Sequence, residues 1–418
     1  METDVLVCGG GCAGLGAALA AARNGAKVVL VERAGFAGGI ITAAGLPFFD
    51  GIAHKTSGRV VVKGIALEML SRLGVCPPDA TTIRPHNPMI PHVDRFKLLA
   101  DELLVEQRDR LRVLFHSFAC EATTRGDRIE EVRVANKAGL TAIRPKVVID
   151  CTGDGDIGAW AGAPFEKATP LMPMTLHFRI GHVRKSPDLT RLCRESLVKA
   201  HADGKLKLFY GPGLMFHYAD DEVYFHAIRV SGDATDPDDL TRAEMQGRAD
   251  AWTMFETWKR EVPGFEQSYF VGVFPYIGIR ETRRILGPHV LTAEDIRQSR
   301  RFEDAVATGC WYLDIHPNSA TPGAAQLVEG FQPEPYDIPY RSILANRISN
   351  LLVAGRCHSA TREAASSTRV TVTAMALGQA AGTAAALAVE RRTTPHELNG
   401  RDVREKLHQQ HAGPVLPN

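Results

Sequence analysis

The segment from Asp4 to Glu32 constrains the fold of this chain most. Asp4–Cys8 is a short apolar run rich in β-branched residues, which predicts a buried strand. A glycine-rich turn follows at residues 9–14, and residues 15–24 are rich in Ala and Leu, as is typical of a helix. Residues 27–32 predict a second buried strand that ends in an acid, Glu32. The segment therefore predicts a β-turn-α-β unit.

The turn has the spacing G-x-G-x-x-G, and each of its glycines has a physical role. Gly9 permits a tight turn, Gly11 lets a phosphate approach the backbone, and Gly14 lets the helix lie close to the sheet. The phosphates of a dinucleotide would face the unpaired N–H groups and the positive end of that helix. Glu32 can accept hydrogen bonds from ribose hydroxyl groups, and its charge disfavours the 2′-phosphate of NADP. The predicted dinucleotide-binding residues of this unit are Gly9, Gly11, Cys12, Ala13, Gly14 and Glu32.

Length and charge narrow the class of protein. A chain of 418 residues has room for two or three domains. The 49 basic and 48 acidic residues give a net charge of +1, so no nucleic-acid or membrane-surface partner is expected. No apolar run reaches the length of a membrane span, and the first residues carry no basic leader.

The eight cysteines are scattered through the chain. None of them forms C-x-x-C or a zinc-like spacing, so neither a metal site nor a redox-active disulfide is predicted. We therefore expect a protein of the reducing cytoplasm without structural disulfides.

Later segments predict further strands of the nucleotide domain. Residues 112–121 predict one strand, and 147–151 predict a buried strand that runs into the turn Gly153–Asp156. Small residues in this turn let it pass close to a nucleotide. An acidic turn that caps a helix at 157–161 is the alternative, and Asp154 and Asp156 suit that role too.

The pattern changes after Pro164. Residues 174–180, 214–218 and 222–230 alternate like strands with one wet face, and 189–203 and 241–262 predict helices. We interpret this part as a β-rich α+β substrate domain inserted in an α/β, Rossmann-like domain. The predicted division is 1–165 and 275–391 for the nucleotide domain, 166–274 for the substrate domain, and 392–418 for a loose tail with a short helix near 402–410. A last long helix is predicted at 370–391.

Several motifs carry a resemblance to a known family. They are G-G-G-C-A-G-L-G at Gly9, C-T-G-D-G-D-I at Cys151, G-I-R-E-T-R-R-I at Gly278, D-I-H-P at Asp314, I-P-Y-R-S at Ile338 and N-L-L-V-A-G-R at Asn350. In this order, over about residues 3–390, they resemble the FAD-dependent oxidoreductase family. That family is distantly similar to the fumarate-reductase flavoprotein and to the FAD-binding part of heterodisulfide reductase. The resemblance implies a glutathione-reductase-like FAD-binding fold.

The resemblance also implies which residues hold FAD. The stretch E-R-A-G-F-A-G-G from Glu32 to Gly39 favours FAD over NAD, and a later strand would lend backbone groups to the adenine. The start of the last helix, after Ser366, would face the flavin N1 and O2 with its free N–H groups; capping by Ser366, Ser367 or Thr368 is the alternative. The further FAD-binding residues so implied are Arg33, Gly38, Gly39, Ala119, Cys120, Thr152, Gly153, Asp154, Gly355, Arg356, Arg369 and Val370.

Catalytic candidates follow from the chemistry of the side chains. Arginine binds carboxylate or phosphate through a bidentate fork, so the strongest cationic candidates are Arg280, Arg283, Arg341 and Arg362, of which Arg280 and Arg341 are the predicted catalytic residues. An Arg–Glu network, for example with Glu281 and Glu363, is the alternative for each of them. His316 and His358 are the predicted general bases, because imidazole titrates near neutrality. Tyr276 and Tyr340 are weaker proton donors.

Three functions are compatible with these features. The favoured one is a dehydrogenase or oxidase, in which hydride passes from a small, polar or anionic substrate to flavin N5 and then to O2 or a carrier protein. The second is a C=C reductase or hydroxylase that receives reduced flavin from a partner, since no second G-x-G-x-x-G for NAD(P)H is present. The third is a non-catalytic electron-transfer subunit, against which the lack of an iron–sulfur cysteine cluster argues.

Overall fold

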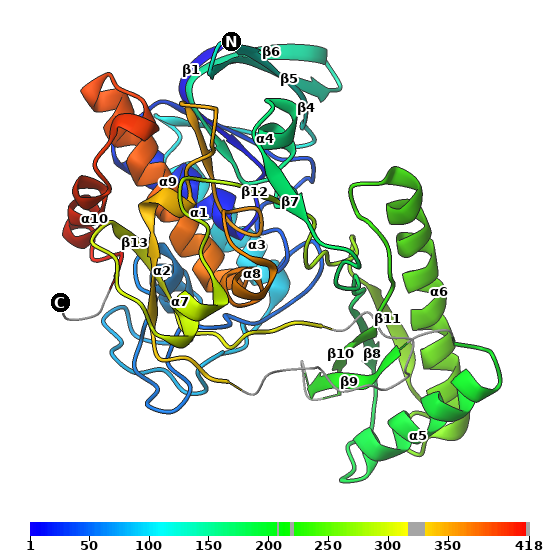
Figure 1. Cartoon of the computed structure of the whole chain (residues 1–418). Coiled ribbons are helices and arrows are strands. Elements are labelled where there is room, and N and C mark those ends of the chain that lie inside the picture. Colours follow the sequence, from blue (N-terminus) through cyan, green and yellow to red (C-terminus); the bar gives the residue numbers. More distant parts are fainter. Residues whose placement is uncertain (207–208, 218–220, 317–330, 415–418) are drawn as a thin grey trace.

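The main sheet of the computed structural model, which describes residues 1–206, 209–217, 221–316 and 331–414, is built on the first strand (Figure 1). β1 (Glu2–Cys8) lies between β2 (Val28–Val31) and the long strand β6 (Gly139–Asp150), and it is parallel to both. β3 (Leu111–Leu114) extends the sheet beyond β2, and β15 (Leu351–Val353) pairs with the last residues of β6. The α/β, Rossmann-like fold that the sequence predicts is confirmed.

A smaller antiparallel layer grows from the first half of β6. β4 (Phe118–Arg125) and β5 (Arg128–Asn136) pair antiparallel, and β5 continues onto β6. The prediction of one strand over 112–121 is therefore wrong. The chain turns at His116, whose φ is 49°, because β3 must pair with β2 whereas β4 must pair with β5.

Two helices cross at very short range beneath the sheet. They are α1 (Cys12–Arg23) and α9 (Thr371–Arg391). A Cβ atom on Gly378 would lie 1.9 Å from the carbonyl oxygen of Ala13, and one on Gly382 would lie 2.2 Å from that of Ala17. The matching order of these contacts shows that the helices run parallel, so both begin at the same edge of the sheet.

α9 is the one helix among the described residues that is long and apolar enough to cross a membrane, judged by length and composition. By this measure the expectation that no apolar run reaches the length of a membrane span is wrong for α9, whose apolar run consists largely of alanine and glycine. Most of α9 is buried inside the protein, as a core helix is.

The other helices cover the main core. They include α2 (Ile65–Arg72), α3 (Val93–Glu106) and α10 (Gly400–Gln409). Because Val403 and Leu407 of α10 are buried in that core, the prediction of a loose tail is wrong for this helix. The remaining elements here are α4 (Asp156–Trp160), α7 (Ala293–Arg297), β13 (Ala305–Gly309), β14 (Tyr336–Pro339), η1 (Tyr340–Ser342), α8 (Arg362–Thr368) and η2 (Pro395–Glu397).

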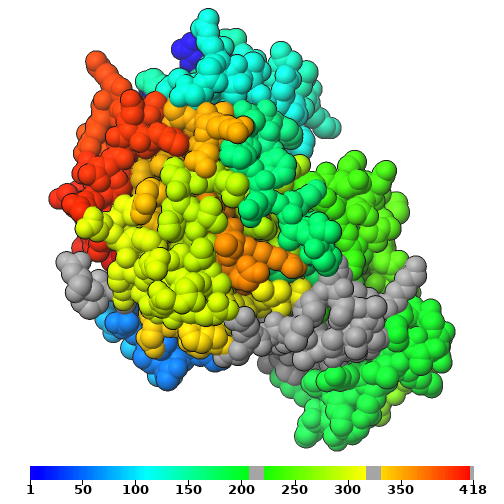
Figure 2. Space-filling model, in the orientation of Figure 1, coloured from blue at the N-terminus to red at the C-terminus, as the bar shows by residue number. Residues whose placement is uncertain are grey.

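The inserted unit forms a second lobe, drawn in green in Figures 1 and 2. Its antiparallel sheet has the order β11-β8-β10-β9, and its aromatic core includes Phe178, Phe225 and Trp258. The short strands β7 and β12 pair where the chain leaves the main body and where it returns. The elements of this part are β7 (Phe165–Lys167), β8 (Phe178–Gly181), α5 (Leu189–Ala202), β9 (Phe209–His217), β10 (Val223–Ile228), α6 (Pro237–Glu261), β11 (Tyr269–Val273) and β12 (Arg283–Ile285).

The short α1–α9 distance predicts the effect of one methyl group. Gly378→Ala should lower the free energy of unfolding by about 2 kcal/mol, since overpacking against a backbone carbonyl outweighs the roughly 1 kcal/mol that alanine gains in helix propensity. Chemical denaturation measures this change. Ala376→Ser, on the half-buried side of the same helix, should change it by less than about 0.5 kcal/mol. Equal free energies of unfolding for Gly378→Ala and wild type would contradict the close contact between Gly378 and the carbonyl oxygen of Ala13.

Candidate functional site

One cavity of about 530 Å³ runs from the start of α1 to the inserted unit. Its walls come from the β1–α1 turn, the loop that follows β2, the Thr152–Asp156 turn, the start of α9 and residues 175, 177, 226 and 276–280. The predicted FAD-binding residues that line it are Gly9, Gly11, Cys12, Ala13, Glu32, Arg33, Gly39, Ala119, Thr152, Gly153, Asp154, Arg356, Arg369 and Val370.

The glycine turn leaves the first N–H groups of α1 accessible. Gly11 is the N-cap residue, and no side chain caps the helix. A Cβ atom on Gly14 would lie 1.8 Å from the carbonyl oxygen of Gly9, whereas one on Gly11 would meet nothing closer than Gly39 Cα at 3.7 Å. Gly14 is therefore required by packing of the chain itself, whereas the space beside Gly11 is open to a ligand.

Glu32 is held rigidly at the end of β2. Its carboxylate accepts hydrogen bonds from the backbone N–H groups of Gly10 (2.6 Å) and Ala34 (2.7 Å). The next residue, Arg33, places its guanidinium 5.4 Å from the ring centre of Tyr276, across the cavity wall. The fixed carboxylate beside the glycine turn suits ribose hydroxyl groups.

Asp154 links the Thr152–Asp156 turn, which follows β6, to two distant parts of the chain. Its Oδ1 accepts hydrogen bonds from Arg356 (2.9 Å) and from the Thr282 hydroxyl (2.8 Å). Gly153 has a φ of +79°, and a Cβ atom there would lie 2.6 Å from the Arg356 guanidinium. A side chain at position 153 would therefore displace this pair.

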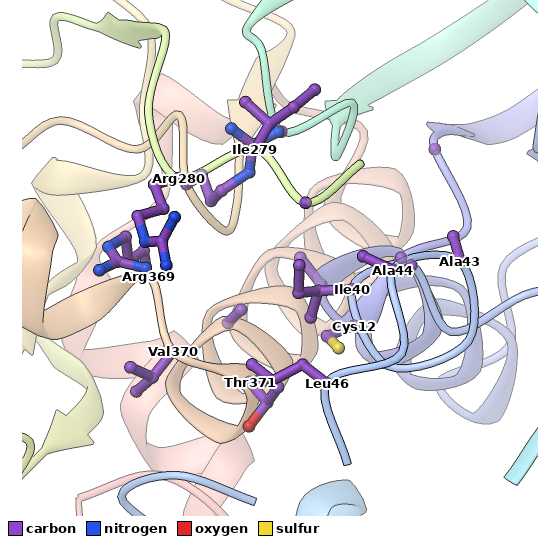
Figure 3. Close-up of a pocket in the computed structure, with 18 of the residues that line it drawn as sticks. Cys12, Ile40, Ala43, Ala44, Leu46, Ile279, Arg280, Arg369, Val370 and Thr371 are labelled. Atoms are coloured by element: carbon purple, nitrogen blue, oxygen red, sulfur yellow. The ribbon is translucent and has the colours of Figure 1, made fainter. Parts of the chain in front are cut away.

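The helix start that faces the cavity lies later than the sequence predicts. Ser366, Ser367 and Thr368 lie inside α8, which is capped by Thr361, so the predicted capping role of these three residues is wrong. The helix breaks at Arg369 and α9 begins with Val370 as its N-cap residue, without a side-chain cap. In Figure 3 Val370 and Thr371 lie at one side of the cavity, below Arg369 and Arg280.

A chain of three side chains fixes the orientation of Arg280. Arg280 Nη2 lies 3.0 Å from His226 Nε2, and His226 Nδ1 lies 2.9 Å from His177 Nε2. His177 Nδ1 lies 2.5 Å from the carbonyl oxygen of Ala44, which only accepts. Each histidine is therefore neutral with its proton on Nδ1. Arg280 donates to His226, His226 donates to His177, and His177 donates to the carbonyl oxygen of Ala44. Burial lowers the pKa of His177 to about 3, which agrees with this arrangement.

His316 is also held in its neutral form. Its Nδ1 accepts from Arg229 Nη2 at 3.0 Å, so the proton is on Nε2, which lies 3.3 Å from Asp314 Oδ1. Burial and the charge of Arg280 lower the pKa of His316 to about 3. Burial raises the pKa of Asp314. The neighbouring His316, Arg369 and Arg280 lower this pKa by more, so that it lies well below its usual value. His316 therefore lines the cavity with both ring nitrogens occupied.

Some predicted site residues lie outside the cavity wall. Arg341 is exposed and pairs with Asp304 at 2.9 Å, and His358 is buried, with Nε2 2.7 Å from the Thr368 hydroxyl. The Cys120 thiol points to the carbonyl oxygen of Arg133. Gly14, Gly38 and Gly355 lie behind the wall. Their positions do not place Arg341, His358 or Cys120 in contact with a ligand of the cavity.

The arginines for which an Arg–Glu network was the alternative differ in their partners. Arg283 pairs with Asp156 at 2.8 Å, and Arg362 pairs with the buried Glu281 at 3.0 Å. Arg280 instead bonds to Pro173 O and the Thr175 hydroxyl, besides His226. Arg280 is thus the arginine of this group that lines the cavity.

Sequence reasoning did not single out Asp50 or the aromatic wall beside it. Asp50 lies in a Phe-Phe-Asp-Gly turn that has no signature of its own. Trp311 stacks on His86 at 5.7 Å and on Tyr312 at 4.6 Å, and all three line the cavity. The D-I-H-P motif, which begins two residues after Tyr312, was the nearest signal for this wall.

Comparisons with known proteins found one family and several solved structures to which this chain is similar. The sequence model of one family, described as FAD dependent oxidoreductase, matches residues 4–407. A geranylgeranyl bacteriochlorophyll reductase-like structure from Thermoplasma acidophilum is 14% identical, covers 98% of this chain and 84% of its own, and has a TM-score of 0.49. For p-nitrophenol 4-monooxygenase from Pseudomonas putida these values are 14%, 98%, 86% and 0.46, and for the myxobacterial chondrochloren halogenase they are 13%, 98%, 81% and 0.47. No curated protein sequence matches the chain.

Buried neutral histidines predict how stability depends on pH. Burial lowers the pKa of His358 to about 4, so below pH 6.5 the unfolded state binds a proton that the folded state does not. Acidification from pH 7 to 5 should cost about 2 kcal/mol of unfolding free energy for this histidine. His358→Gln cannot titrate, and denaturation at both pH values should show a smaller loss than in wild type. An unchanged loss would contradict the neutral state of His358.

Proposed function

The chain belongs to the FAD dependent oxidoreductase family, and we propose that it oxidises a small, polar or anionic organic substrate at the Arg280 end of its cavity. The observation that carries this proposal is the continuity of the cavity. One space joins the uncapped start of α1, Glu32 and the uncapped start of α9 to Arg280 and Arg369.

The residues along the cavity fit FAD, which is the cofactor of this family. The N–H groups at Gly11 and the start of α1 would hold the diphosphate, and Glu32 would bind the ribose. Ala119 would lie at the adenine, while Asp154 and Arg356 would close the wall between the two halves of the domain. The start of α9 would lie at the flavin, because its N–H groups favour negative charge.

Bound FAD would supply the two-electron redox chemistry, and the protein would supply charge and position. Arg229 and Arg280 are buried, and Arg369 has a buried Nε–H group without a hydrogen-bond partner among the described residues. The carboxylate of Asp314 lies among these guanidinium groups, whereas the neighbouring histidines are neutral. The excess positive charge favours a substrate that carries a carboxylate or another anionic group.

The class of substrate can be tested through the colour of the cofactor. The FAD-loaded protein would be mixed without oxygen with hydroxy acids, amino acids, alcohols and amines. Loss of the oxidised-flavin absorption with a hydroxy acid or amino acid is the expected result. A protein that binds FAD but is bleached by none of these classes would contradict the proposal.

Gly11 offers a direct test of the cofactor site. Gly11→Ala should fold normally, because its φ of −70° suits alanine and its nearest neighbour would lie 3.7 Å away. The added methyl group would meet the phosphates, so FAD affinity should fall about tenfold or more, which is 1.4 kcal/mol. FAD titration by fluorescence and thermal unfolding of the FAD-free protein measure the two effects. Unchanged affinity would remove Gly11 from the FAD site.

Arg280 offers a test of the anionic end. Arg280→Gln should weaken binding of acetate to the FAD-loaded protein about tenfold, since one charge-assisted contact is lost. Binding would be followed by the visible spectrum or by calorimetry. Arg341→Gln is the matched control, because Arg341 is exposed and paired with Asp304, and it should bind acetate like wild type. Equal losses in both variants would contradict a specific role of Arg280.

A further inference from the structure

Asp50 projects from a turn that is fastened to the start of α9. The Thr371 hydroxyl donates to the carbonyl oxygen of Phe48 at 2.9 Å, and the Cys310 thiol lies 3.3 Å from that of Gly51. The turn is thus held on both sides of Asp50, and its carboxylate lines the cavity. Its position is therefore set by α9 and by the segment of Trp311.

The surroundings of Asp50 leave its carboxylate open to the cavity. Asn87 Nδ2, at 3.5 Å, is its one hydrogen-bond partner among the described residues. The charged groups whose fields reach it are Asp314 and Arg369, and Lys55 and His86 line the same cavity.

The other carboxylates of the cavity wall, and two of its histidines, already have hydrogen-bond or ion-pair partners. Glu32 accepts from two backbone N–H groups, Asp154 from Arg356 and Thr282, and Asp156 from Arg283. His226 and His316 each have both ring nitrogens occupied, and Asp314 pairs with Arg369. Within the part of the chain that the structure describes, Asp50 is the carboxylate in this wall whose one hydrogen bond is a long one to a neutral amide.

We propose, on the basis of the proposed function, that Asp50 is the catalytic acid–base residue of this enzyme. Its carboxylate takes the O–H or N–H proton that the substrate releases on oxidation. Bound FAD would supply the two-electron oxidation by accepting the hydride equivalent from carbon, so the substrate loses a hydride and a proton, and Asp50 becomes neutral. The proton then passes to solvent before the next turnover.

The charge state of Asp50 supports this role. Burial and the nearby carboxylate of Asp314 raise the pKa of Asp50 to about 7, against the opposing effects of Asn87 and Arg369. A base with a pKa near the working pH is ionised often enough to accept a proton and strong enough to hold it.

The test compares wild type with Asp50→Asn, both loaded with FAD. Asparagine keeps the shape and can still accept from Asn87, but it cannot take a proton. In the variant, FAD should bind as in wild type, while bleaching by the substrate found in the screen should slow about 100-fold or more. Asp50→Glu should recover part of the rate. Bleaching of Asp50→Asn at the wild-type rate would overturn the proposal.

Acetate provides a second measurement that does not need turnover. In wild type, acetate affinity should fall as pH rises through 7, because ionised Asp50 repels the anion, and in Asp50→Asn this loss should disappear. Asp402→Asn, which removes a surface carboxylate paired with Arg391, should keep the wild-type profile. Identical profiles in wild type and Asp50→Asn would overturn the assignment of Asp50 as the titrating group. A wild-type protein that binds FAD and acetate but is bleached by nothing would instead overturn the proposed function.

Discussion

The close contact between α1 and α9 is the constraint on which the site depends. Gly378 and Gly382 let the helix axes approach until a single methyl group would strike the carbonyl oxygens of Ala13 and Ala17. Because the helices are parallel, their positive ends open on the same cavity. Gly378, the α9 residue that contacts Ala13, lies seven residues beyond Thr371, so the two starts are offset by about 10 Å along the helix axis. The cavity therefore has two separate positions, one at each helix start, where free N–H groups favour negative charge.

The polar wall of the cavity follows from a different principle. Burying an unpaired charge is costly, so Arg280 and the histidines next to it each have partners that also fix their direction. Arg280 can only donate and Ala44 O can only accept, so His226 and His177 between them have no freedom of tautomer. The same logic makes His316 neutral between Arg229 and Asp314. The histidines thus position arginines and do not compete with them for an anion.

The sequence was most informative where local chemistry alone sets the structure. The β1–α1 turn and Glu32 need only a strand, three glycines and a helix, and these were placed correctly along the chain. Contacts between residues distant in sequence could not be predicted. The residues around Arg341 do not indicate its ion pair with Asp304, and those around Asp50 do not indicate its contact with Asn87 or the link of its turn to α9. The break between α8 and α9 was missed because Ser366–Thr368 resemble caps although they lie inside a helix.

The position of Asp50 also explains why the inserted lobe and the main body must act together. Arg280 and Thr175 come from the segments that join the lobe to the main body, and His226 comes from β10 of the lobe and His177 from the residue before β8. Asp50, Asp314 and Arg369 come from the main body. An anionic group held by the first set would meet a proton acceptor from the second. Among the residues that line the cavity, the buried guanidinium of Arg280 comes from the lobe side and the carboxylate of Asp50 from the main body, so the roles proposed for them require the two parts to be aligned.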